Sequence, residues 1–114
     1  MFGEYEATLS YQLPQEVLKT VMDEAVDRYL ASHQNVFPIN RDNCAIELKV
    51  QKSCVSKGEI VEIVIQNETF YVVSRYIEES PRSIVEWIKN RYNVMVLAAY
   101  LKDAIHELSY GVVA

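Results

Sequence analysis

The sequence predicts an α+β fold, a two-layer sandwich in which helices cover one face of a mostly antiparallel, four-stranded sheet. Two observations lead to this prediction. Apolar and polar side chains alternate in several short segments, as in half-buried strands, and apolar side chains recur at three- and four-residue steps in longer segments, as in helices. The segments follow one another in the order β-α-β-β-β-α-α, and 114 residues suit a single α+β domain over residues 1–114.

The first strand and the first helix have the clearest patterns. Residues 4–13 alternate strictly between polar and apolar side chains, which indicates a half-buried strand. Pro14 ends this strand because it lacks a backbone N–H, and it suits the start of a helix. A helix is expected from Gln15 to about His33, with one apolar side facing the core. The next segment, Gln34 to Asn43, is rich in turn-forming residues and is interpreted as a loop.

Three more strands are expected in the middle of the chain. Residues 44–50 alternate, and residues 59–66 and 69–77 are rich in β-branched and aromatic side chains. The core side of the first of these strands is expected to carry Cys44, Ile46, Leu48 and Val50. A two-residue turn at Asn67 and Glu68 joins the other two strands, although glutamate fits the positive φ of such a turn poorly.

This turn determines which side chains share a face of the sheet, because opposed residues of an antiparallel pair point to the same side. The core side then carries the pairs Ile65–Phe70, Ile63–Val72 and Val61–Ser74. The outer side carries the pairs Val64–Tyr71, Glu62–Val73 and Ile60–Arg75. An apolar patch is therefore expected on the outer side, made of Ile60, Val64, Tyr71, Val73 and Ile77. A slip of one residue in register would exchange the faces of one strand.

Two helices are expected at the end of the sequence. Ser80 and Pro81 form a helix start, and the first helix is predicted to end at Tyr92, before Asn93. Its buried side is expected to carry Ile84, Val85, Trp87 and Ile88. Five tyrosines are assigned to core positions: Tyr5, Tyr11, Tyr29, Tyr92 and Tyr100.

The second of these helices is expected from Val94 to about Tyr110, with Gly111 as its C-terminal cap. Residues 94–101, which include Leu97, are apolar nearly all round the helix. A helix segment of this kind must be covered on several sides, either by the rest of the domain or by a partner.

The sequence contains few groups that support catalysis. Three glycines leave no glycine-rich phosphate loop, so no cofactor is expected. The best catalytic alternative is Asp103, His106 and Glu107, which fall on one side of a helix and would suit a hydrolytic metal site. The competing interpretation, which we favour, is a solvated helix surface.

Nucleic-acid binding is a second alternative, and the charge balance argues against it. A net charge of -5 offers no basic surplus for phosphate contacts. The basic side chains on or beside the central strands are Arg41, Lys49, Lys52, Lys57 and Arg75.

The sequence therefore favours a small acidic, non-enzymatic module that binds another protein or itself, as inhibitors, immunity proteins, secretion chaperones and viral accessory factors do. Its expected contact residues are Ile60, Val64, Tyr71, Val73, Arg75 and Leu97. No signal peptide and no apolar run long enough for a bilayer of about 30 Å are visible, which predicts a cytoplasmic protein, or one in the host-cell cytoplasm if it is viral.

Overall fold

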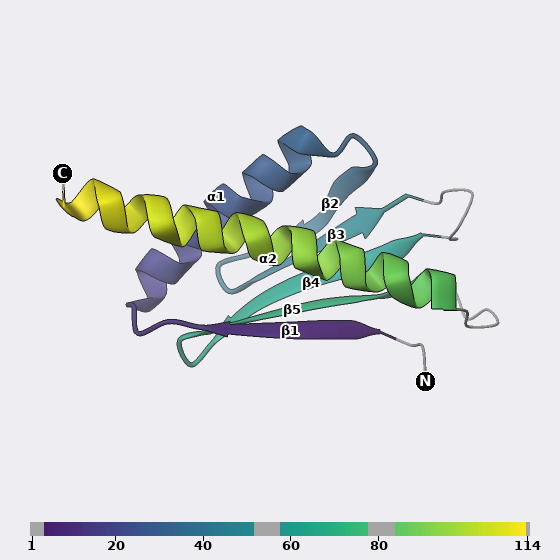
Figure 1. Cartoon of the computed structure of the whole chain (residues 1–114), viewed down its shortest axis with the longest axis horizontal. Coiled ribbons are helices and arrows are strands. Elements are labelled where there is room, and N and C mark those ends of the chain that lie inside the picture. The colour runs from purple at the N-terminus through teal and green to yellow at the C-terminus, as the bar shows by residue number, and fades with distance from the viewer. Residues whose placement is uncertain (1–3, 52–57, 78–83, 114) are drawn as a thin grey trace.

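The computed structural model describes residues 4–51, 58–77 and 84–113, and in this part of the chain five strands form one antiparallel sheet (Figure 1). The strands are β1 (Tyr5–Ser10), β2 (Val36–Arg41), β3 (Ala45–Val50), β4 (Glu59–Gln66) and β5 (Thr69–Tyr76). The helices are α1 (Gln15–Ser32) and α2 (Ile84–Val113). The strand order across the sheet is β1-β5-β4-β3-β2. The α+β class is confirmed, whereas the expected four strands and the order β-α-β-β-β-α-α are wrong.

The additional strand, β2, lies in the segment for which the sequence predicts a loop. It pairs with β3 at the edge of the sheet, and its register shifts between Pro38 and Asn40. Proline is tolerated on an edge strand because the missing N–H has no neighbouring strand to bond to. The residues of this segment favour a loop, but its backbone pairing with β3 makes it a strand.

The two expected C-terminal helices form one helix of 30 residues, α2. Asn93, where the sequence predicts a break, is buried in the first half of this helix, and its amide Nδ2 donates hydrogen bonds to Glu59 and Ser74. The polar side chain is thus bonded to the sheet and does not compete with the helical backbone. Gly111 lies inside α2 and not at its cap, while the expected helix start at Ser80 and Pro81 lies outside the described residues.

The hairpin between β4 and β5 has the expected register. Val64 opposes Tyr71, and Ile60 opposes Arg75. The turn residues Asn67 and Glu68 have φ angles of 51° and 61°, the left-handed conformation that a two-residue hairpin turn requires. The alternation of the two strands is strong enough to impose this conformation on a glutamate.

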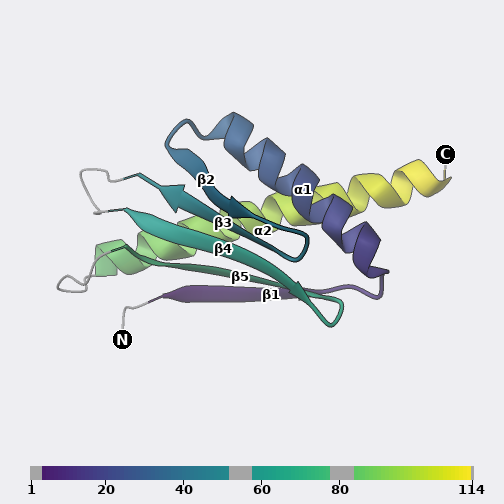
Figure 2. The ribbon, with the colours of Figure 1, turned by 180° about the vertical axis from the view of Figure 1, so that it is seen from behind.

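The core lies between the sheet and the two helices, and α1 and α2 also pack against each other (Figures 1 and 2). Its largest fully buried members include Tyr29, Phe70, Leu18, Met22, Ile46, Leu48, Ile63, Leu97 and Leu101. Neither helix, within the described residues, has a stretch both long and apolar enough to cross a bilayer.

Three residues that were expected in the core are on the surface. Cys44 is exposed, because it precedes β3 in a turn where the Asp42 carboxylate accepts the N–H groups of Cys44 and Ala45. Ile88 and Tyr92 lie on the side of α2 that faces away from the sheet. The assumed break at Asn93 gave these two residues the wrong helical phase.

Candidate functional site

The face of the sheet opposite the helices is the main candidate site, and we call it the open face. Both helices pack on the side that carries the buried strand residues, so within the described chain neither helix covers the open face (Figure 2). Its central side chains are half-buried by their neighbours on the adjacent strands and remain partly accessible. A sheet face of this kind is available for contact with another molecule.

Four rows of side chains cross the open face from strand to strand, as the pairing registers show, and the row beside the β4–β5 turn is polar, made of Ser10, Thr69 and Gln66. The apolar row consists of Thr8, Tyr71, Val64 and Ala45. The acidic row consists of Glu6, Val73, Glu62, Glu47 and Asn40. The basic row consists of Arg75, Ile60, Lys49 and Phe37. The face therefore combines apolar contact area with charge of both signs.

Five of the six expected contact residues lie together on the open face: Ile60, Val64, Tyr71, Val73 and Arg75. The sixth, Leu97, is fully buried in the core between α2 and the sheet. Because a residue with no accessible surface makes no contact with a partner of the folded protein, Leu97 is excluded from the site.

Glu47 and Glu62 are the electrostatic centre of the open face. They oppose each other directly on β3 and β4, an arrangement that is unfavourable for two carboxylates. The Arg75 guanidinium, from β5, reaches across β4 and forms an ion pair of 3.2 Å with the Glu47 carboxylate. Among the described residues, Arg75 forms the only ion pair with these two carboxylates, so one of the two negative charges has no ion pair there.

A small hollow opens beside this pair of carboxylates. Its volume is about 120 Å³, and Asn40, Ala45, Ile46, Glu47 and Glu62 line it. Since one water molecule occupies about 30 Å³ of liquid, the hollow has room for the end of a single side chain. Sequence reasoning missed the hollow because Asn40 belongs to β2, although the alternation of β3 and β4 already placed both glutamates on the same face.

In the alternative metal site on α2, one of the three candidate ligands, Glu107, is bonded to an arginine. Asp103, His106 and Glu107 are all exposed, and the Glu107 carboxylate is bonded to the Arg28 guanidinium of α1. This hydrogen bond with Arg28 lowers the pKa of the Glu107 carboxyl. Across the residues described in the structure, no three His, Cys, Asp or Glu side chains come together in a way that would hold a metal ion.

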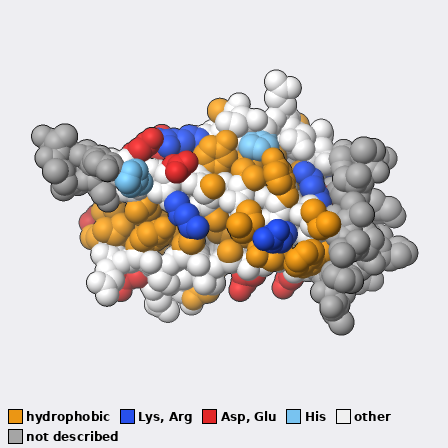
Figure 3. Space-filling model, viewed as in Figure 1, with side chains coloured by type: hydrophobic (Ala, Val, Ile, Leu, Met, Phe, Trp, Pro, Cys, Tyr) orange, Lys and Arg blue, Asp and Glu red, His pale blue; other side chains and the backbone are white. Residues whose placement is uncertain are grey.

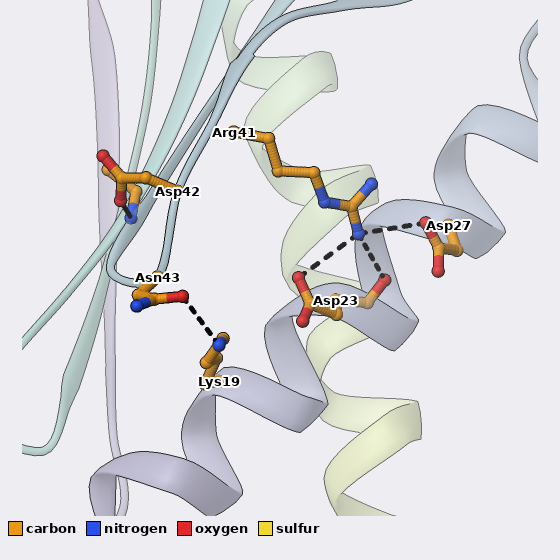
Figure 4. A network of polar contacts seen from close by, with 7 residues as sticks. Lys19, Asp23, Asp27, Arg41, Asp42 and Asn43 are labelled. Carbon is orange, nitrogen blue, oxygen red and sulfur yellow. Dashed lines mark hydrogen bonds and ion pairs between the residues drawn. The ribbon is translucent and has the colours of Figure 1, made fainter.

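The basic residues considered for nucleic-acid binding are partly neutralised. The Arg41 guanidinium forms ion pairs with Asp23 (3.2 Å) and Asp27 (3.0 Å) of α1, as Figure 4 shows. Arg75 is paired with Glu47, and Lys52 and Lys57 lie outside the described residues. The described cations on and beside the open face therefore do not form a continuous positive surface.

A buried polar cluster links α2 to the sheet, and we define it as Glu59, Ser74, Asn90 and Asn93. All four side chains have almost no accessible surface. Asn93 Nδ2 donates to Glu59 Oε1 at 2.8 Å and to Ser74 Oγ at 3.2 Å, and Ser74 Oγ donates to Asn90 Oδ1 at 2.7 Å. Glu59 and Ser74 alternate in phase with core residues of their strands, which was the sequence signal for this cluster.

The comparisons with known proteins do not assign the chain to a family. No model of a protein family matches the chain, and no curated protein is significantly similar to it.

Proposed function

We propose that this protein is a non-enzymatic interaction module whose open face binds a basic, partly apolar surface of a partner protein. The observation that carries the proposal is the hollow of about 120 Å³ lined by Glu47 and Glu62, where, within the described part of the chain, Arg75 forms the only ion pair with the two carboxylates. A lysine or arginine side chain of the partner would fill the hollow and complete the charge balance.

The apolar row supplies the remaining contact. Tyr71 and Val64 lie next to the acidic row, and an aromatic ring beside a charged pocket is the usual composition of an energetically important contact. The net charge of -5 adds a long-range attraction toward a basic partner, which increases the association rate at low salt. Binding should therefore weaken as salt is added.

We also propose, from the sequence, that the protein is located in the cytoplasm. Fractionation of the native source, with the chain detected by an antibody, checks that location independently of binding.

The proposal is tested with purified, tagged protein and an extract of its native source. The wild-type protein is expected to retain a partner in low salt that Tyr71→Asp and Glu62→Lys lose. Glu16→Lys makes the same charge change on the exposed start of α1 and should retain the partner. Melting curves of all three variants verify that loss of binding is not loss of folding.

Two results would contradict the proposal. One is equal retention of the same partner by Tyr71→Asp, Glu62→Lys and wild type. The other is a partner that binds as well at high salt as at low salt, because a contact centred on Glu47 and Glu62 depends on charge.

A further inference from the structure

A second surface lies on the opposite side of the molecule, along the side of α2 that faces away from the sheet. We call it the outer stripe, and it consists of Ile88, Tyr92, Met95, Ala99, Lys102 and His106. All six residues are exposed, and the side chains of Ile88, Tyr92 and Met95 expose 54%, 50% and 48% of their surface. Figure 3, which views the molecule from this side, shows hydrophobic side chains gathered between scattered cationic ones.

The outer stripe has the spacing of a helix-packing seam. Its members follow one another at alternating steps of four and three residues, the pattern that keeps one side of a helix in line with a second helix. The stripe extends over about 27 Å from Ile88 to His106. Leu97, Leu101 and Ala104 occupy the core side of the same helix, so the exposed hydrophobic side chains of Ile88, Tyr92 and Met95 lie on a separate side of α2.

The side chains along the outer stripe are complementary to those of a second copy in the antiparallel direction. When Met95 of one copy faces Ala99 of the other, a large side chain meets a small one, as close helix packing requires. The same register sets Tyr92 against Lys102, whose aliphatic stem and ammonium group suit an aromatic ring. Both contacts occur twice, because the pairing is symmetric.

The charges beside the stripe favour the same arrangement. The Lys89 ammonium group lies 5.2 Å from the centre of the Tyr92 ring. Asp103 follows Lys89 by two repeats of seven residues, so both side chains are on the same flank of α2. In the antiparallel register, Lys89 of each copy lies beside Asp103 of the other. A parallel pair would instead set the flank that carries Lys89 and Asp103 against the opposite flank of the partner helix, so this contact between opposite charges would not form.

We propose that the outer stripe of α2 is a self-association surface, which binds a second copy of this chain as an antiparallel helix pair. One helix against one helix is a small interface, so the dimer forms reversibly and depends on protein concentration. The open face lies on the other side of the sheet and stays accessible in this dimer. The inference therefore stands apart from the proposed function.

The test is sedimentation equilibrium of the whole protein over a wide range of concentrations. The wild-type protein is expected to form a dimer, and Met95→Asp is expected to be a monomer with an unchanged melting temperature. Ile39→Asp is the matched control, because Ile39 on β2 exposes 52% of its surface, and this variant should dimerise normally.

The antiparallel register is tested by exchanging charges. Lys89→Glu and Asp103→Lys should each weaken the dimer by about threefold to tenfold, since each creates two like-charged contacts. The double variant Lys89→Glu/Asp103→Lys should recover an affinity within about threefold of wild type, because the pair is then restored with reversed sign. Lys49→Glu, on the far side of the sheet, should have no effect.

Three outcomes would overturn the inference: a wild-type protein that is monomeric at every concentration, a Met95→Asp variant that still dimerises, or a double charge exchange without recovery. A monomer whose outer stripe binds an amphipathic helical peptide would assign the surface to another protein. The two proposals can fail independently of each other. Tyr71→Asp should dimerise normally, and Met95→Asp should still retain the partner of the open face.

Discussion

The buried polar cluster predicts a large stability effect at a position where sequence alone predicts a break in a helix. The change Asn93→Ala removes the amide that donates to the Glu59 carboxyl at 2.8 Å and to the Ser74 hydroxyl at 3.2 Å. Each acceptor then loses a hydrogen bond at a site that has almost no accessible surface. Loss of a buried hydrogen bond to an acceptor of this kind costs about 1 to 3 kcal/mol, and the cost is higher when the acceptor is a carboxyl group.

We therefore expect Asn93→Ala to lower the free energy of unfolding by about 3 kcal/mol. For a domain of this length, this loss corresponds to a melting temperature about 12 to 15 °C lower. The measurement is thermal unfolding followed by circular dichroism, together with urea unfolding to obtain the free energy. Asn40→Ala is the matched control, since Asn40 is exposed on β2, and it should change stability by less than about 0.5 kcal/mol.

A second variant distinguishes the hydrogen bonds from simple loss of volume. Asn93→Asp keeps the size of the side chain but replaces the Nδ2 donor with an oxygen that accepts hydrogen bonds, so the bonds to Glu59 and Ser74 are lost without loss of volume. It should destabilise the protein at neutral pH at least as much as Asn93→Ala does. The reasoning is refuted if Asn93→Ala melts within a degree or two of Asn40→Ala.

Three other predictions concern the turn, the surface ion pair and the Cys44 thiol. Glu68→Gly should raise the free energy of unfolding by about 1 kcal/mol, because Glu68 has a φ of 61° that glycine adopts without steric cost. Urea unfolding measures this change, and an unchanged or lower stability would contradict the prediction. Arg28 holds the pKa of Glu107 below its ordinary value, so the ion pair stabilises the fold above the pKa of an unfolded glutamate and loses this effect as pH falls through the lowered pKa. The melting temperature of Glu107→Gln should therefore be slightly below that of wild type at about pH 7 and equal to it at about pH 2. A difference in melting temperature that does not change with pH would show that the ion pair is not its cause. Cys44 is exposed, so the native protein should react with a thiol reagent faster than it unfolds, and Cys44→Ser should remove that reaction phase.

Most of the open face was predictable from the sequence because it follows from local alternation. The pairs Ile60–Arg75 and Val64–Tyr71 depend on two alternating strands and on the length of one turn, and both are properties of adjacent residues. The hollow beside Glu47 and Glu62 was not predictable, because it also requires Asn40 and therefore the pairing of β2 with β3.

The sequence by itself determined the α+β class, the bounds of α1 and the faces of β3, β4 and β5, since each of these has a period that neighbouring residues set. Tertiary structure alone decided the features that depend on a distant partner. Asn93 continues a helix because Glu59 lies opposite it, and Pro38 belongs to a strand because β3 lies beside it. The segment around Leu97 is apolar on nearly every side, so its sequence contains no information about which side faces the sheet; only packing buries Leu97 and leaves Met95 exposed.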